Sequence, residues 1–370
     1  MPPQSDDDAR VEGVPEHAAL SPVQRFIAEA VERRREKFNV WENPLDNKAI
    51  LLQDARKRRR TTPKGLGNSH LLMHKERLIG GVTWVYGGAT TLVSHQAQHA
   101  AQSLQVQRQY LKASEVPTVS GRSFHSSSYG AAEAHLNRMH GAVTVRPTAT
   151  RVRGGTTMNV SSPEHFKAAW EKTSAACARL RSVDQLIELE EYRPGLALRL
   201  YVVGEDVVAG VVRVPLYVVG NGKSTIGTLV DEELKKRSAC EYLRGTQPTI
   251  DDAFLAPRGL KRDTVPEAGR VQLLTYDTDR REGGLTVDVL NRVSPDLRSL
   301  AVDAMWAFPG LSATAVDILT PSLEKTEEAI VSSIDPNASL AEFLYPAYGE
   351  YRRVGLAVLD HMIHSPIRRR

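Results

Sequence analysis

Two arginines lie among apolar, β-branched residues in the middle of the chain. Arg199 opens the run Arg-Leu-Tyr-Val-Val, and Arg213 stands between Val-Val and Val-Pro. Such runs are typical of buried strands, where an unpaired guanidinium is unfavourable. Each arginine is therefore expected to meet a carboxylate or a phosphate. If the partner belongs to the protein, the contact is a structural ion pair; if it belongs to a ligand, the arginines line an active site.

Turn signals separate the strands that carry these arginines. Gly204, Glu205 and Asp206 stand between two valine pairs, which predicts a β-hairpin. Asn221 and Gly222 form a second strong turn signal, and we expect hairpin-like strands there as well.

Short motifs follow one another in a fixed order between about Ser103 and Asp360. They are Leu-Glu-Glu-Tyr-Arg-Pro-Gly at 189–195, Arg-Leu-Tyr-Val-Val-Gly at 199–204, Arg-Val-Pro at 213–215, Gly-Lys-Ser-Thr-Ile at 222–226, Leu-Val-Asp at 229–231, Gly-Gly at 283–284, Ala-Val-Asp at 315–317 and Leu-Tyr-Pro at 344–346. No single motif is specific. Their order and spacing together resemble the ATP-grasp ligases, most closely the ATP-grasp domains of cyanophycin synthetases and bifunctional glutathione synthetases.

This resemblance implies a fold, a reaction and two cofactors. The fold would be α/β, an ATP-grasp fold with an amino-terminal α/β lobe and ATP held between two α+β lobes. The reaction would be ATP-dependent joining of a carboxylate, from an amino acid or short peptide, to an amine through an acylphosphate, with release of ADP and phosphate. The cofactors would be ATP and Mg²⁺. The alternative is a non-catalytic descendant that binds nucleotide or ligand without turnover.

The resemblance places the phosphates of ATP on one strand end and the loop after it. Arg146 occupies the position where the family usually has a lysine, and it keeps the charge but not the compact shape of lysine. Gly154 and Gly155, followed by Thr156, could turn backbone N–H groups toward phosphate. An ion pair between Arg146 and a surface carboxylate is the structural alternative.

The hinge between the lobes matches Glu190, Glu191, Tyr192 and Arg193. Their backbone would pair with the adenine edge, and Glu190 could accept from its amino group. A second acidic residue, which binds ribose in the family, is Ala197 here.

Two aspartates match the metal positions of the family. Asp317 occupies the aspartate position, but the glutamate and asparagine that usually follow on the next strand are Ser333 and Asp335 here. Since Mg²⁺ prefers anionic oxygen ligands, the two aspartates could hold one ion. A turn or capping role is the alternative for each.

The acyl substrate would meet three arginines. Arg199 and Arg213 match basic positions on the acceptor side, and Arg281 stands in the loop before Gly283 and Gly284 in place of a smaller polar residue. This change implies a different carboxylate donor from that of the relatives.

The 370 residues are expected to form several lobes. We expect a disordered tail at 1–20, an amino-terminal α/β lobe at 21–112, a nucleotide-binding lobe at 113–194 and a central and carboxy-terminal lobe at 195–370. No second catalytic domain fits beside these, so we expect a free-standing ligase.

Local patterns predict two of the early helices. Ser21, Pro22 and Gln24 form a capping-box-like start for a helix ending near Phe38. The segment 95–111 lacks Gly and Pro and favours one continuous helix. Its His95 and His99 have a metal-ligand spacing, but a surface pair is the interpretation we adopt.

Composition excludes several functions. A net charge of +4 and the basic run at 56–60 would suit nucleic acid, but no aromatic interleaving or zinc pattern accompanies them, so we predict no nucleic-acid partner. The apolar runs are too short to span a membrane. The two cysteines, Cys177 and Cys240, suggest no disulfide framework, which favours the cytoplasm. A homodimer is a further possibility.

Overall fold

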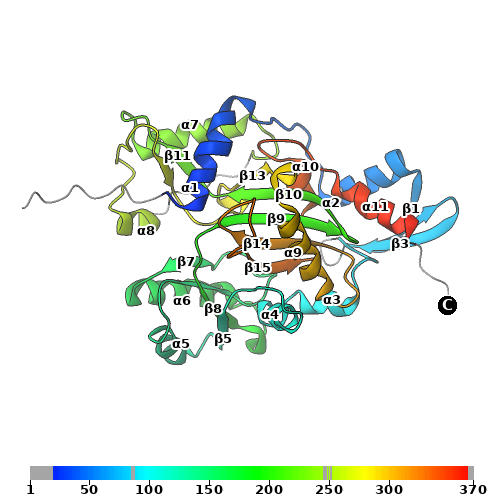
Figure 1. Cartoon of the computed structure of the whole chain (residues 1–370), viewed down its shortest axis with the longest axis horizontal. Coiled ribbons are helices and arrows are strands. Elements are labelled where there is room, and N and C mark those ends of the chain that lie inside the picture. The colour runs from blue at the N-terminus through cyan, green and yellow to red at the C-terminus, as the bar shows by residue number, and fades with distance from the viewer. Residues whose placement is uncertain (1–19, 85–87, 245–247, 249, 251, 366–370) are drawn as a thin grey trace, which may run out of the picture.

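The computed structural model of the chain describes residues 20–84, 88–244, 248, 250 and 252–365 (Figure 1). The expected disordered tail, apart from Leu20, lies outside these residues. Within them, no helix has the length and apolar character needed to cross a membrane.

The first helix begins where the sequence predicts. The Ser21 hydroxyl accepts from the Gln24 N–H (3.4 Å), and the Gln24 side chain accepts from the Ser21 N–H (3.1 Å). Helix α1 (Pro22–Phe26) continues through the π-helical turn η1 (Ile27–Val31) and the 3₁₀ turns of η2 (Glu32–Lys37). The capping box and the end near Phe38 are both confirmed.

Three main sheets make up the body of the molecule, and the five-stranded sheet lies at its centre (Figure 1). This central sheet has the order β13-β10-β9-β14-β15 and is antiparallel throughout. Its strands are β9 (Leu196–Val203), β10 (Asp206–Val214), β13 (Leu285–Asp288), β14 (Ala313–Thr320) and β15 (Ile330–Asp335). The hairpin predicted around residues 204–206 is the connection between β9 and β10.

Side-chain alternation gives the central sheet two different faces. Leu198, Leu200 and Val202 of β9 pack with the first helix and with α9 (Pro295–Trp306). Tyr201 and Val203 face the other way, toward α11 (Val354–His364), the short helix α10 (Leu340–Leu344) and the amino-terminal elements. Because successive strand residues point to opposite faces, Arg199 lies on this second face.

A four-stranded sheet of order β5-β8-β6-β7 lies beside the central sheet, below it in Figure 1. Its strands are β5 (Gly121–His125), β6 (Val143–Pro147), β7 (Thr157–Val160) and β8 (Leu186–Glu191). Helices α5 (Tyr129–Leu136) and α6 (Pro163–Cys177) cover this sheet. Phe166 and Trp170 of α6 complete the core beneath them.

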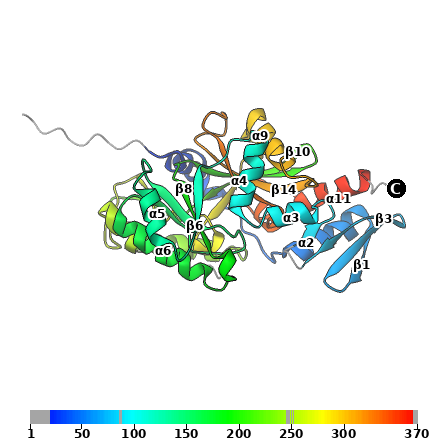
Figure 2. The same cartoon turned by 90° about the horizontal axis from the view of Figure 1, so that it is seen from below.

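A second four-stranded sheet, of order β1-β2-β3-β4, lies at the other end of the molecule, next to α11 (Figure 2). Its strands are β1 (Thr61–Leu66), β2 (Ser69–His74), β3 (Arg77–Thr83) and β4 (Ala89–Thr90), and α2 (Asn47–Gln53) and η3 (Asp54–Arg58) precede it. The lobe boundaries at residues 20, 112 and 194 remain a prediction.

The segment 95–111 does not form one helix, so that prediction is wrong. Helix α3 (His95–Ala100) and helix α4 (Leu104–Ala113) are separate. Between them, Leu104 N–H donates to the carbonyl of Thr148 (2.9 Å), and Gln102 O accepts from Thr150 N–H (3.0 Å). Tertiary hydrogen bonds to the loop after β6 therefore override the local helix preference.

The prediction of a hairpin at Asn221 and Gly222 is also wrong. Strand β11 (Tyr217–Val219) pairs with β12 (Val271–Leu273), which lies about fifty residues further on. Gly222 does adopt a left-handed turn (φ 70°), but this turn leads into α7 (Ile226–Ser238), capped by Thr225. A further short helix, α8 (Asp252–Leu255), follows before β12.

Candidate functional site

Three cavities meet where the sheet of order β5-β8-β6-β7 approaches the central sheet. Their volumes are about 930, 760 and 650 Å³, and we call them the first, second and third cavity. Arg213 lines all three, Arg199 and Asp335 line the second and third, and Asp317 lines the first and third. Four of the charged residues that the sequence singled out, Arg199, Arg213, Asp317 and Asp335, are thus brought to one place.

The register of the central sheet explains why these side chains meet. Asp317 is the cross-strand partner of both Arg199 and Ser333, and Asp335 lies two residues beyond Ser333. Directly paired residues on antiparallel strands share a face, as do residues two apart on one strand. All four side chains, and that of Arg213 on β10, therefore emerge on the same face of the sheet.

Arg199 is only 3% exposed and contacts three carboxylates. Its Nη1 donates to both oxygens of Asp317 (2.8 and 2.7 Å), and its Nη2 donates to Asp335. Its Nε lies 3.3 Å from Glu342 Oε2 but has no hydrogen-bond partner among the described residues. The Ser333 hydroxyl donates to Asp317 Oδ2 (2.8 Å).

Arg213 is held by Glu342 on α10. Its Nε donates to Oε1 and its Nη2 to Oε2 (2.9 Å), a two-pronged contact, and its Nη1 lies 3.5 Å from Asp317 Oδ1. We call Arg199, Arg213, Asp317, Asp335 and Glu342 the charge cluster. Glu342 is a site residue that the sequence reasoning missed; its only signal is a charge between the apolar Ala341 and Phe343.

The charge cluster favours ionised groups despite its burial. Burial raises the pKa of Asp317 and of Glu342, but the neighbouring Arg199 and Arg213 outweigh it and hold both pKa values below their usual range. Burial lowers the pKa of Arg199, yet Asp317, Glu342 and Asp335 raise it overall. Asp317, Glu342 and Arg199 are therefore charged near neutral pH.

Arg146 and Glu190 form an ion pair at the wall of the first cavity. Arg146 Nη2 donates to Glu190 Oε1 (2.8 Å) and to the carbonyl of Ser332 (3.3 Å), while its Nε lacks a partner among the described residues. Both residues line the first cavity, and Arg146 also lines the third. The ion pair is thus internal to the cleft, and the arginine retains donors for a ligand.

The two loop glycines serve different purposes. Gly154 and Gly155 both have left-handed backbone (φ 73° and 75°). A Cβ on Gly155 would lie 2.7 Å from Ala176 Cβ on α6, whereas one on Gly154 would meet nothing within 4 Å. Neither glycine lines a described cavity, but Thr156 and Arg153 line the third. Gly155 is therefore required for close packing on α6.

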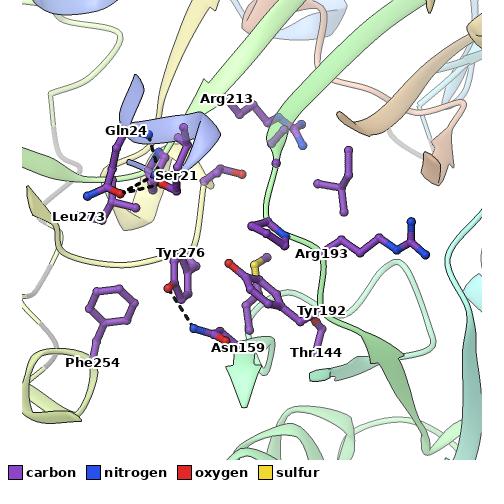
Figure 3. Close-up of a pocket in the computed structure, with 18 of the residues that line it drawn as sticks. Ser21, Gln24, Thr144, Asn159, Tyr192, Arg193, Arg213, Phe254, Leu273 and Tyr276 are labelled. Carbon is purple, nitrogen blue, oxygen red and sulfur yellow. Dashed lines mark hydrogen bonds between the residues drawn. The ribbon is translucent and has the colours of Figure 1, made fainter. Parts of the chain in front are cut away.

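The hinge residues line the first cavity (Figure 3). The N–H of Glu191 donates to Ser120 O (3.0 Å), and that of Tyr192 to Ala142 O (2.9 Å). After these two bonds, the hinge N–H that remains for a base is that of Arg193, because Pro194 has none. The Arg193 side chain pairs with Glu191 (3.3 Å).

The wall opposite the hinge comes from residues 254–276, which sequence reasoning did not assign to the site. Tyr276 lies 5.8 Å from Tyr192, ring centre to ring centre, and its hydroxyl accepts from Asn159 Nδ2 (3.1 Å; Figure 3). Phe254 and Arg258 complete this wall, with the guanidinium 3.7 Å above the ring. Contacts across the cleft thus join β7 and the hinge to the central lobe.

Arg281 lies at the rim of the second cavity. It is half exposed and pairs with Asp279 (3.0 Å) in the turn η6 (Arg280–Glu282). It does not belong to the charge cluster.

Two carboxylates of the charge cluster could supply ligands to one Mg²⁺ ion. Asp317 and Asp335 line the third cavity together and offer hard oxygen donors. Among the described residues, no group of three or more His, Cys, Asp or Glu side chains could hold a metal. Mg²⁺ bound through one or two carboxylates takes its other ligands from phosphates and water, which suits this pair.

Known proteins share this architecture. No protein-family model matches the sequence. A glutathione biosynthesis bifunctional protein from Enterococcus faecalis is 27% identical over 271 residues, which cover 69% of this chain and 34% of the relative. A cyanophycin synthetase from Geminocystis herdmanii is 28% identical over 214 residues, covering 56% of this chain and 24% of the relative.

The crystal structure of a bifunctional glutathione synthetase from Pasteurella multocida superposes with a TM-score of 0.57 at 21% identity, covering 86% of this chain and 44% of that one. The predicted ATP-grasp fold is therefore confirmed, as is the sequence similarity to ATP-grasp carboxylate–amine ligases. The chain spans about a third or less of the length of the curated relatives described here.

Proposed function

We propose that the protein is an ATP-dependent ligase that joins a carboxylate to an amine through an acylphosphate and releases ADP and phosphate. The observation that carries the proposal is the meeting of three cavities at Arg213, beside Arg199 and Asp317. A reaction that transfers a phosphoryl group from a nucleotide to a carboxylate needs this arrangement, because both reactants must reach one cationic point.

The charges that line the cavities support separate places for phosphate and for substrate. Among the described residues, the third cavity has five arginines and two carboxylates: Arg146, Arg151, Arg153, Arg199, Arg213, Asp317 and Asp335. The second has six of each: Arg153, Arg199, Arg213, Arg244, Arg280, Arg281, Asp46, Glu241, Asp277, Asp279, Asp335 and Glu342. An excess of positive charge suits a triphosphate, and a balanced lining suits a zwitterionic amino acid or peptide.

The roles of the residues follow from their places. The hinge from Arg193 onward would bind the base in the first cavity, and Arg146 with the loop at Thr156 would bind phosphates. Asp317 and Asp335 would hold Mg²⁺, which would neutralise the phosphate oxygens. Arg199 and Arg213 would then stabilise the charge that develops on the acylphosphate. Arg281 would contact the substrate at the rim of the second cavity.

A substrate matrix tests this function. Release of ADP and phosphate from ATP and Mg²⁺ is measured over pairs of amino acids and short peptides, with each compound alone as the control. We expect turnover that requires a carboxylate and an amine together. If ATP and Mg²⁺ bind but no pair gives ADP above the single-compound controls, the alternative of a non-catalytic nucleotide-binding protein is favoured.

One observation favours that alternative. Both Nη groups of Arg199 already pair with Asp317 and Asp335, the two groups that would hold the metal. The neutral Ser333 and Ala197 also stand where the family has acidic residues. Turnover in the matrix would exclude the alternative.

Assembly and location stay proposals. A homodimer would be detected by sedimentation velocity, and a cytoplasmic location is what the two free cysteines favour.

A further inference from the structure

Glu342 lies between the two arginines of the charge cluster. Its carboxylate accepts from Nε and Nη2 of Arg213, and its Oε2 lies 3.3 Å from Nε of Arg199. The side chain is 14% exposed and lines the second cavity. Its backbone carbonyl accepts from the Thr286 hydroxyl on β13 (3.3 Å), which ties α10 to the edge of the central sheet.

The contact with Arg213 uses only one edge of the guanidinium. A guanidinium has five N–H donors in a rigid plane, so a carboxylate on the Nε and Nη2 edge also fixes where Nη1 points. In this structure Nη1 lies on the Asp317 side of the group, 3.5 Å from Oδ1 of that residue. Since Arg213 lines all three cavities, its orientation decides what reaches their meeting point.

The carboxylate also separates two like charges. Arg199 and Arg213 repel each other in a buried place, where Coulomb interactions are strong. Asp317 and Asp335 offset part of this repulsion, but they are the same groups that would hold Mg²⁺. Glu342 is the one carboxylate of the charge cluster that contacts both arginines and has no proposed metal role.

We propose that Glu342 is a positioning residue of this site. Glu342 fixes Arg213 through the Nε and Nη2 edge, so that the Nη1 edge stays turned toward the transferred phosphoryl group. It also keeps Arg199 beside Arg213 when Asp317 and Asp335 bind the metal. This inference rests on the proposed ligase function.

The test uses Mg²⁺·ADP with fluoroaluminate, an anion that mimics a phosphoryl group in transfer. Calorimetry gives the affinity for Mg²⁺·ADP with and without fluoroaluminate in the wild type and in Glu342→Gln. We expect the variant to bind Mg²⁺·ADP alone within about threefold of the wild type, because the base and its neighbouring phosphates are bound elsewhere. We call the ratio of the Mg²⁺·ADP affinity with fluoroaluminate to that without it the fluoroaluminate gain. This gain should fall by about tenfold or more in the variant, since the guanidinium loses its charged two-pronged partner.

Asp288→Asn is the matched control. Asp288 is a buried carboxylate that holds Arg352 in the same two-pronged way (3.0 and 2.9 Å), but it lines none of the three cavities. If Glu342 were only a structural ion-pair partner, both variants would lower the melting temperature and leave the fluoroaluminate gain intact. That result overturns the proposal.

A double variant covers the case in which Glu342→Gln does not fold. Arg213→Gln is compared with Arg213→Gln/Glu342→Gln, which removes both buried charges of the pair. If Glu342 acts through Arg213, the second substitution causes no further loss of fluoroaluminate gain. A further loss in the double variant overturns the proposal. Failure of the wild type to bind Mg²⁺·ADP would instead contradict the proposed function itself.

Discussion

Asp317 and Asp335 differ in how firmly the protein holds them. Asp317 contacts Arg199 and Arg213, accepts from Ser333 and is 19% exposed at its side chain. Asp335 is 39% exposed, and Arg199 is its one ion-pair partner among the described residues. An oriented carboxylate binds a metal with less loss of freedom than a mobile one, because its position is already fixed. The two aspartates should therefore contribute unequally to Mg²⁺ binding.

We predict that Asp317→Asn weakens Mg²⁺ more than Asp335→Asn does. The apparent Mg²⁺ affinity of the nucleotide complex should fall by about tenfold or more in Asp317→Asn, since the amide removes a charge beside the ion. Asp335→Asn should lower this Mg²⁺ affinity by a smaller factor. Mg²⁺ titrations of nucleotide binding, followed by calorimetry, compare the two variants.

The melting temperatures serve as the control for these two variants. Asp317→Asn also leaves Arg199 with one carboxylate fewer in a buried place, so some loss of stability is expected. Equal Mg²⁺ affinities in the wild type and both variants would remove the pair from the metal site.

At the scale of elements, the loop after β6 shows why a glycine pair can be misread. A Gly-Gly sequence near a phosphate site suggests close approach of a ligand, yet Gly155 is required for close packing of the loop against Ala176 of α6. Gly154, with the same left-handed backbone, faces no neighbour. The difference depends on packing between β6, β7 and α6, which no local pattern records.

We predict that Gly155→Ala destabilises the protein more than Gly154→Ala. Both alanines would strain a left-handed backbone at a cost of about 1–2 kcal/mol. Only the alanine at 155 would also meet Ala176, and such overpacking adds about 1–3 kcal/mol. Urea unfolding measures the two free energies. Equal losses in both variants would show that α6 moves aside without cost.

The same distinction between local and distant causes explains what the sequence could predict. The capping box at Ser21 depends on neighbours three residues apart, and the hairpin at Gly204 joins adjacent strands, so both are predictable. The split at residues 101–103 depends on a loop more than forty residues away. Glu342 and Tyr276 reach the site from α10 and from the segment before η6, and a single sequence does not show which distant residues will meet.

At the scale of the whole molecule, the sheet of order β5-β8-β6-β7 contacts the rest of the molecule across the first cavity. The Asn159 side chain of β7 donates to the Tyr276 hydroxyl (3.1 Å), at the edge of the first cavity. Asn159 has left-handed backbone within its strand (φ 58°), a conformation that costs energy for residues other than glycine. Arg146 makes a second contact by donating to Ser332 O. If the two sides of the first cavity separate when a nucleotide is released, the Asn159–Tyr276 contact has to break.

We therefore predict that Tyr276→Phe speeds nucleotide release. The variant keeps the ring but loses the acceptor for Asn159 and the hydroxyl interactions with Tyr192 and Arg258. Loss of the Asn159 hydrogen bond alone, about 1 kcal/mol, corresponds to a release about fivefold faster. Stopped-flow measurements with a fluorescent ATP analogue give the rate. Tyr129→Phe is the matched control, because the Tyr129 hydroxyl donates to Glu133 (2.9 Å) within α5 and the side chain lines none of the three cavities. Since Tyr129 spans no cleft, its variant should release nucleotide at the wild-type rate. Indistinguishable rates for the two tyrosine variants would mean that the lobes open without breaking the Asn159–Tyr276 contact.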